Sequence, residues 1–91
     1  MRQSELKVDG NAIAGLLREI FAFEMTMAES TCAGCGRVDA LGAVDVYMNA
    51  PGIVLRCPGC NSILMRIVKA EGRCWLDLRG VRTLELRDVS A

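Results

Sequence analysis

The sequence contains no histidine and few aromatic residues. Its 91 residues include two Phe, one Tyr and one Trp, and its formal net charge at pH 7 is zero. Without histidine, the chain lacks the commonest general base and a frequent metal ligand. No apolar run reaches the length of about 18 residues that a membrane-spanning helix needs, and a balanced charge argues against general binding to polyanions. We therefore expect neither an enzyme nor a membrane protein.

Residues 1–9 are polar and lack the apolar run of a secretory signal. We therefore expect a cytoplasmic, reducing environment, in which cysteines serve as metal ligands more often than as disulfides. Ninety-one residues make one domain, near the size at which a small core benefits from a metal. The expected organisation is a single domain over 1–91.

Four of the five cysteines form two C-x-x-C pairs separated by 21 residues. Each pair places two thiolates on one tight turn, and four thiolates form the tetrahedral site that zinc prefers. Such a site leaves no position for water or substrate, so we predict one structural zinc. The predicted ligands are Cys32, Cys35, Cys57 and Cys60.

The residues around the cysteines predict that the two turns are alike. Gly34 and Gly59 occupy the same place in each pair, and Asn61 stands where the first pair has Gly36. Glycine adopts a left-handed backbone without penalty, and asparagine tolerates it better than most other residues. Backbone N–H groups of such turns are expected to point at the sulfur atoms.

Four cysteines can also serve in disulfides, in redox chemistry or in an iron site. Two disulfides would need an oxidising compartment, and a redox C-x-x-C is expected once, beside a βαβ unit. Four thiolates also suit iron, as in rubredoxins. Rubredoxins are rich in aromatic residues around the metal, which this chain is not. Electron transfer at a four-thiolate iron is the functional alternative that such a site would imply.

The N-terminal part predicts one long helix after a polar leader over 1–9. Apolar residues recur at helical spacing over 10–28 and cover about half of the circumference. A small sheet can cover only part of this arc, so the helix is a candidate surface for a protein partner or a second copy. Glu24 falls inside the arc, and so either the helix ends or bends near Phe23 or an arginine from the basic C-terminal half, 56–91, holds the carboxylate.

The remaining residues, 29–91, predict the two cysteine turns and an antiparallel sheet. Apolar and polar residues alternate over several short runs separated by turn residues. The expected fold class is α+β, a zinc ribbon with a small antiparallel sheet and one N-terminal helix. Cys74 shares a strand face with Leu76 and Leu78, so we expect a core thiol there. Trp75 then faces the other way, either packed or as an exposed anchor.

Charge divides unevenly along the chain. Residues 1–55 carry four basic and seven acidic side chains, whereas 56–91 carry seven basic and four acidic ones. The C-terminal excess favours either a solvated sheet face or nucleic-acid binding by phosphate contacts. The candidate residues for such contacts are Arg66, Lys69, Arg73, Arg79, Arg82 and Arg87.

The two cysteine pairs on a hairpin resemble zinc-ribbon domains of transcription and translation factors. A closer resemblance is to a small bacterial family of unknown function. It rests on the segments D9-G-N-A-I-A-G-L, E24-M-T, T31-C-A-G-C-G, P51-G-I-V-L-R-C-P-G-C and L76-D-L-R-G. The resemblance implies a metal-binding domain without an established activity. The width of the helical arc and the absence of catalytic chemistry favour a protein interaction module, with nucleic-acid binding as the alternative.

Overall fold

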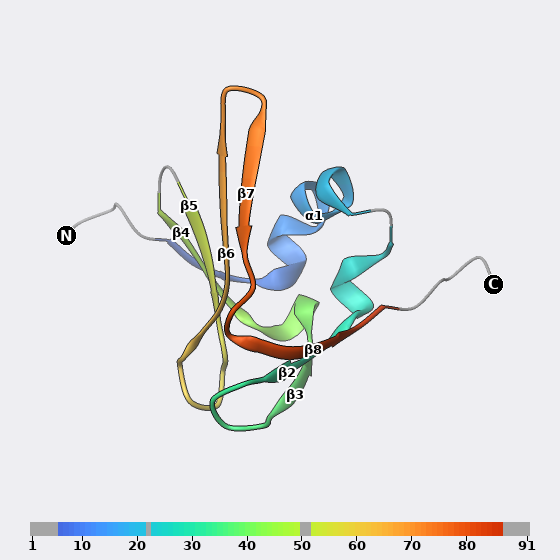
Figure 1. Cartoon of the computed structure of the whole chain (residues 1–91), viewed down its shortest axis with the longest axis vertical. Helices are drawn as coiled ribbons and strands as arrows, with labels where there is room; N and C mark the ends of the chain where they lie inside the picture. The colour runs from blue at the N-terminus through green and yellow to red at the C-terminus, as the bar shows by residue number, and fades with distance from the viewer. Residues whose placement is uncertain (1–5, 22, 50–51, 87–91) are drawn as a thin grey trace.

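The structure is a computed structural model of the chain, and it describes residues 6–21, 23–49 and 52–86. In these residues, one α-helix and three 3-10 turns pack beside two antiparallel sheets (Figure 1). The predicted α+β class is confirmed. Within the same residues, no helix is long and apolar enough to cross a membrane.

The larger sheet has five strands in the order β1-β4-β5-β6-β7, each antiparallel to its neighbours. Its inner face carries buried side chains such as Val46, Leu55 and Ile67, because alternate residues of a strand point to one face. The strands are β1 (Leu6–Asp9), β4 (Asp45–Asn49), β5 (Gly52–Arg56), β6 (Ile63–Ala70) and β7 (Arg73–Asp77).

The second sheet has three strands in the order β3-β2-β8, where a single small sheet had been expected. Its strands are β2 (Glu29–Cys32), β3 (Val38–Ala40) and β8 (Val81–Glu85). The chain passes from β7 to β8 through Gly80, whose N–H donates to Leu64 O at 3.2 Å and whose carbonyl accepts from Ala33 N at 2.9 Å. Because Gly80 has no side chain, the chain can pass close to Leu64 and Ala33 after β7. It then enters the second sheet instead of extending the first.

The predicted leader and long helix are wrong in their bounds. Within the expected leader, residues 6–9 form β1, whereas residues 1–5 lie outside the described residues. The expected helix over 10–28 is divided into η1 (Gly10–Ile13), α1 (Ala14–Ile20) and η2 (Met25–Met27), with residue 22 outside the description. The helix ends where Phe21 adopts an extended backbone, with φ −114° and ψ 155°.

Glu24 explains why the apolar arc does not continue as a helix. Its carboxylate accepts hydrogen bonds from Arg18 Nη2 at 3.1 Å and from Thr26 Oγ1 at 2.6 Å. A continuous helix would bury this charge in the arc at high cost. The break keeps Glu24 paired, and it buries Leu17 and Met25 while Phe23 and Met27 stay exposed. The apolar residues are therefore divided between two short segments, α1 and η2, and do not form one continuous stripe.

The core lies between the inner face of the five-stranded sheet and these helical segments. It also takes in Ser30, whose Oγ donates to Asp39 O at 3.2 Å. Buried residues from both sheets and from the helical turns contribute to one cluster. Its members are Ile13, Leu17, Met25, Ala28, Cys32, Leu41, Val44, Val46, Leu55, Cys57, Leu64, Met65 and Ile67.

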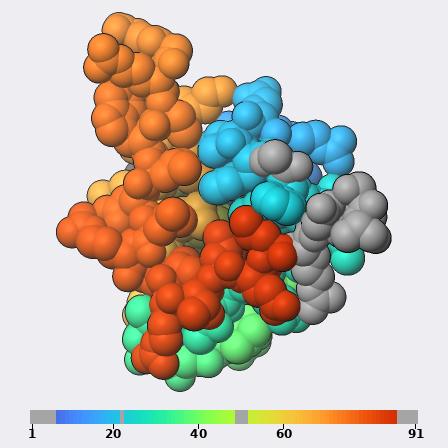
Figure 2. Space-filling view, turned by 45° about the vertical axis from the view of Figure 1, so that its right-hand side comes forward, coloured from blue at the N-terminus to red at the C-terminus, as the bar shows by residue number. Residues whose placement is uncertain are grey.

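Strands β6 and β7 form a hairpin that extends past the rest of the molecule (Figures 1 and 2), which measures 43 × 32 × 20 Å. Its tip turns through Glu71 and Gly72, both with positive φ. Cys74, near the far end of the hairpin, is exposed, so the prediction of a core thiol is wrong. Trp75 is 51% exposed, as an exposed anchor would be.

Candidate metal centre

The four cysteines of the two C-x-x-C pairs come from different sheets. Cys32 is the last residue of β2 and Cys35 lies in the turn before β3, in the three-stranded sheet. Cys57 directly follows β5 and Cys60 precedes β6, in the five-stranded sheet. A metal held by all four would therefore join the two sheets at one end of the molecule.

The sulfur atoms lie at the spacing of a tetrahedral site. All four are within 4.8 Å of one another, and the separations from Cys32 Sγ to Cys60 Sγ and from Cys35 Sγ to Cys57 Sγ are both 3.7 Å. A regular tetrahedron with Zn–S bonds of about 2.3 Å has edges of about 3.8 Å. A disulfide would need about 2.05 Å. The four residues can therefore hold one metal ion with little movement.

The two turns repeat each other bond for bond. In the first, Gly36 N donates to Cys32 O at 2.9 Å and Cys32 N donates to Arg37 O at 2.9 Å. Gly34 N points at Cys32 Sγ at 3.3 Å. These bonds order the first turn around its buried cysteine.

In the second turn, Asn61 N donates to Cys57 O at 2.8 Å and Cys57 N donates to Ser62 O at 2.9 Å. Gly59 N points at Cys57 Sγ at 3.3 Å. An N–H directed at sulfur stabilises the thiolate that a metal requires. The predicted similarity of the two turns is confirmed.

Exposure differs within each pair. The first cysteine, Cys32 or Cys57, is 1% exposed, whereas Cys35 and Cys60 are exposed. The site is thus anchored in the core on one side and open to solvent on the other. An ion can enter from the solvent side, and the buried sulfurs then connect it to the core.

The exposed thiols differ in acidity. The side-chain and backbone hydrogen bonds of Ser62 lower the pKa of Cys60 to about 6. The backbone of Arg37 acts to lower the pKa of Cys35, but desolvation and the hydrogen bonds of the neighbouring thiols outweigh it and raise this pKa to about 11. Of these two exposed thiols, Cys60 ionises first, and metal binding must displace the proton of Cys35.

Two residues beside the centre were not singled out from the sequence. Ser62 Oγ lies 3.2 Å from Cys60 Sγ. The Arg37 guanidinium binds Asp39 Oδ2 through Nε at 2.8 Å, and its charge also interacts with Cys57 and Cys35. Four thiolates around a divalent ion carry a net charge of about −2, which a nearby cation offsets. The signal was their position, since each follows its second cysteine by two residues.

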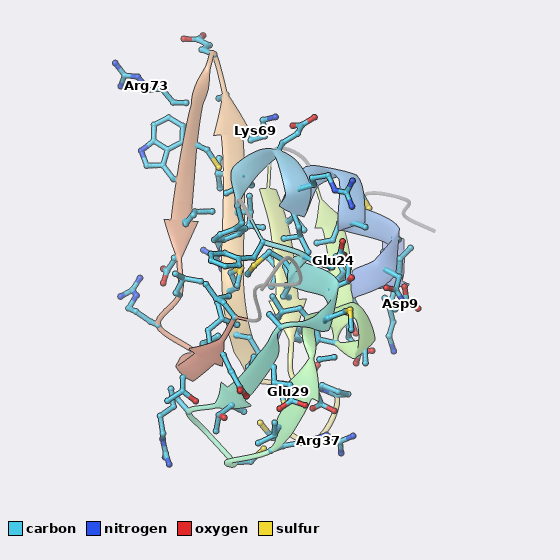
Figure 3. All side chains as sticks on the ribbon, turned by 90° about the vertical axis from the view of Figure 1, so that its right-hand side faces the viewer. Asp9, Glu24, Glu29, Arg37, Lys69 and Arg73 are labelled. Carbon is cyan, nitrogen blue, oxygen red and sulfur yellow. The ribbon has the colours of Figure 1, made fainter. Side chains whose placement is uncertain are left out.

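The basic residues predicted to meet phosphate do not gather on one surface. Lys69 Nζ binds Glu19 Oε1 at 3.0 Å and Arg79 binds Asp77 at 2.7 Å. Figure 3 shows Lys69 and Arg73 pointing to opposite sides of the hairpin. Arg82 belongs to β8 in the other sheet, and Arg87 lies outside the described residues. Among the described candidates, Arg66 and Arg73 share a face of the hairpin, and Arg79 lies near Arg66 in the lining of one hollow.

The sequence profile of a family of unknown function, DUF6510, matches residues 2–89. The chain belongs to this family. The match confirms the predicted resemblance to a family without an established activity, whereas the resemblance to zinc ribbons stays a prediction. No curated protein and no solved structure matches this member of the family at a significant level.

Proposed function

We propose that the four cysteines bind one structural zinc and that the domain acts as a protein interaction module. The observation that carries the zinc site is the grouping of four sulfurs within 4.8 Å on two matching turns. Structural zinc contributes about 10–16 kcal/mol in small zinc-finger peptides at neutral pH. A gain of that size exceeds the net stability of an ordinary small domain, so folding of this chain would depend on the metal.

Iron is the competing metal, because its four-thiolate sites have a similar size. Elemental analysis of protein purified from a medium supplemented with both metals distinguishes them. One zinc per chain without visible absorption supports the proposal. One iron per chain with visible absorption would support electron transfer in its place. Protein without metal, with its cysteines oxidised, would remove both.

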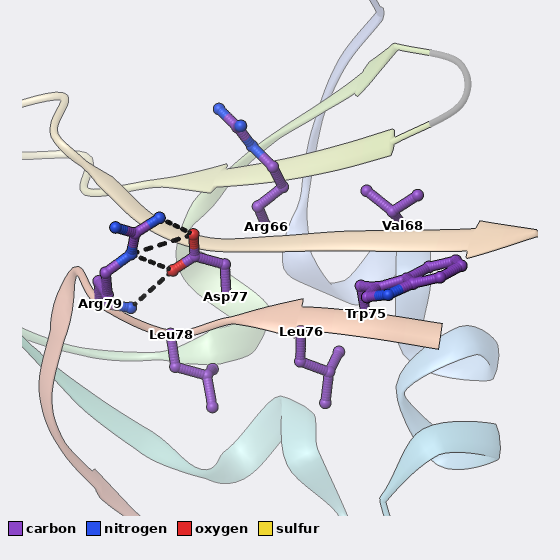
Figure 4. A pocket seen from close by; sticks show the side chains of 7 residues that line it. All are labelled: Arg66, Val68, Trp75, Leu76, Asp77, Leu78 and Arg79. Atoms are coloured by element: carbon purple, nitrogen blue, oxygen red, sulfur yellow. Dashed lines mark hydrogen bonds and ion pairs between the residues drawn. The ribbon is translucent and has the colours of Figure 1, made fainter. Parts of the chain in front are cut away.

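The binding role is supported by the apolar surface around the β6–β7 hairpin. Trp75, Leu76 and Leu78 are 51%, 38% and 38% exposed. They border a hollow of about 450 Å³ along β7 (Figure 4), which Arg66, Val68, Asp77 and Arg79 also line. Clustered exposed apolar side chains mark interaction sites more often than chance exposure does. This surface replaces the long helix as our candidate for the partner site.

Trp75 makes the binding role measurable, because it is the single tryptophan of the chain. A partner that covers β7 should shift its fluorescence emission to shorter wavelength. The variant Trp75→Ser should lose partner capture by the immobilised, zinc-loaded protein. Met27→Ser, at an exposed position on a different element, is the matched control. Equal capture by both variants would place the partner elsewhere.

Nucleic-acid binding is a second candidate, favoured by the outer face of the five-stranded sheet. The strand register places five residues on one side of this sheet, the outer face: Lys7, Tyr47, Val54, Arg66 and Trp75. Lys7 Nζ and Arg56 Cζ lie 6.0 and 5.8 Å from the centre of the Tyr47 ring. Aromatic rings beside cations are the usual platform for single-stranded nucleic acid.

Titration of labelled single-stranded DNA and RNA at low salt tests this candidate. Arg66→Glu should weaken binding, and wild-type affinity should fall steeply with salt. Arg82→Glu, on the three-stranded sheet, should bind like wild type. No binding at low salt would exclude the candidate and leave the protein partner.

A further inference from the structure

Strand β7 is an edge of the five-stranded sheet. It pairs with β6 on one side, and no other described strand pairs with it. Four of its five residues, from Arg73 to Leu76, are exposed, and three of these are cysteine, tryptophan and leucine. An exposed apolar edge strand offers unpaired backbone groups to another strand.

Charged residues at equal distances before and after Trp75 have opposite signs. Two residues before it stands Arg73 and two residues after it stands Asp77; four residues before it stands Glu71 and four after it stands Arg79. An antiparallel pair of two β7 strands centred on Trp75 therefore sets Arg73 opposite Asp77, both inside the strand, while Glu71 in the tip turn and Arg79 after the strand's end come toward each other beyond it. Each contact occurs twice by symmetry.

The neighbouring symmetric registers set no opposite charges facing each other within β7, and they bring like charges together at its ends. A pair centred on Cys74 would face Glu71 with Asp77 of the other copy. A pair centred on Leu76 would face Arg73 with Arg79. Like charges directly opposite each other destabilise a strand pair. The charge pattern thus selects the register centred on Trp75 over both alternatives.

We propose that two copies of this protein associate by antiparallel pairing of their β7 strands about a twofold axis at Trp75. The inference rests on the interaction role proposed above and names a second copy as the occupant of β7. The two indole rings would lie side by side on the outer face, and Leu76 would lie opposite Cys74 of the second copy. The two five-stranded sheets would become one continuous sheet.

The existing ion pair of Asp77 is compatible with this arrangement. Arg79 donates to the Asp77 carboxylate from its backbone N, Nε and Nη2, at 2.7–3.2 Å, and the side chains of both residues remain partly exposed. Arg73 of the second copy would bring a second guanidinium beside this partly exposed carboxylate. Exposed ion pairs contribute little affinity. Their role here is to determine the register, whereas backbone hydrogen bonds and apolar contacts supply most of the affinity.

Sedimentation velocity of the zinc-loaded, full-length chain between about 1 µM and 1 mM tests the pairing, since small interfaces give concentration-dependent dimers. We expect a monomer–dimer equilibrium accompanied by a shift of Trp75 emission. Arg73→Asp places like charges at both ends and should weaken dimerisation about tenfold or more. The double variant Arg73→Asp/Asp77→Arg restores opposite charges at these positions and should recover the dimer. Arg82→Asp, on β8, is the control and should dimerise like wild type.

A wild-type chain that stays monomeric up to 1 mM would overturn the inference. So would a double variant no better than Arg73→Asp, because the register would then be wrong. A dispersed amide NMR spectrum of each variant establishes that the hairpin is folded. None of these outcomes depends on which metal is bound or on capture of a different protein, so the proposed zinc site and interaction role are tested separately.

Discussion

Gly36 and Asn61 occupy equivalent left-handed positions in the two cysteine turns. Their φ angles are 80° and 66°, and each N–H donates to the carbonyl of the cysteine four residues earlier. This conformation turns the backbone beneath the metal ligands. A residue with a Cβ pays a steric penalty there, which glycine avoids and asparagine partly avoids.

Substitution of Gly36 tests this relationship. A Cβ at Gly36 meets no atom within 4 Å, so Gly36→Ala isolates the backbone penalty and should cost about 1 kcal/mol. Gly15→Ala is the matched control, because that site is equally open but lies inside α1, where alanine should stabilise by about 0.5–1 kcal/mol. Urea denaturation of the zinc-loaded variants measures both. Equal effects would contradict the role assigned to Gly36.

Removal of one predicted ligand should abolish the metal centre. Cys57→Ser replaces a buried thiol, and we expect loss of stoichiometric zinc and of cooperative unfolding. Cys74→Ser changes an exposed thiol outside the cluster, and it should keep one zinc and alter stability by no more than about 0.5 kcal/mol. Zinc retained at full affinity by Cys57→Ser would refute the assignment of the ligands.

Acidification should release the metal because protons compete for the thiolates. The proton of Cys35, whose pKa is about 11, must leave on binding at neutral pH. Zinc affinity should therefore rise with pH and fall by more than about tenfold per unit on acidification below neutrality, where more than one thiol releases its proton. Competition with a chromophoric chelator across pH 5–8 measures this. An affinity independent of pH would contradict four-thiolate binding.

The carboxyl of Glu24 should titrate below its ordinary pKa. Hydrogen bonds from Thr26 and then Arg18 lower its pKa below the ordinary value of 4.5. A carboxyl with a depressed folded-state pKa stabilises the fold above 4.5, and this contribution is lost as the pH falls through the folded-state pKa. Thr26→Val should bring the pKa back toward 4.5, which carbon-13 NMR of the carboxyl measures. Thr83→Val removes a hydroxyl that instead binds Thr31, and it should leave the pKa of Glu24 unchanged.

The crossing at Gly80 leaves no room for a side chain. A Cβ there would lie 1.8 Å from Ile63 O, so Gly80→Ala must separate β6 from the turn before β8. We expect a loss of about 3 kcal/mol or more in the free energy of unfolding. Gly72→Asn, at φ 75° with no atom within 4 Å, is the control and should cost less than about 1 kcal/mol. A wild-type melting temperature for Gly80→Ala would disprove the close crossing.

Local features were predictable because each depends on a few adjacent residues. The C-x-x-C spacing and its following Gly36 or Asn61 predict the turn geometry without knowledge of the remaining fold. Strand β6 follows from its β-branched, apolar run, and the tip at Gly72 follows from a Glu-Gly turn. The helix bounds failed because a wheel pattern cannot distinguish one long stripe from two short segments that bury Leu17 and Met25 separately.

The sequence by itself determined the four cysteines as a candidate metal centre, the similarity of the two turns and the α+β class. Only the tertiary structure decided that the two cysteine pairs come from different sheets. It alone left Cys74 and Trp75 exposed on an edge strand. The physical reason is that ligand spacing and turn conformation are local properties, whereas burial depends on which distant segments cover a surface.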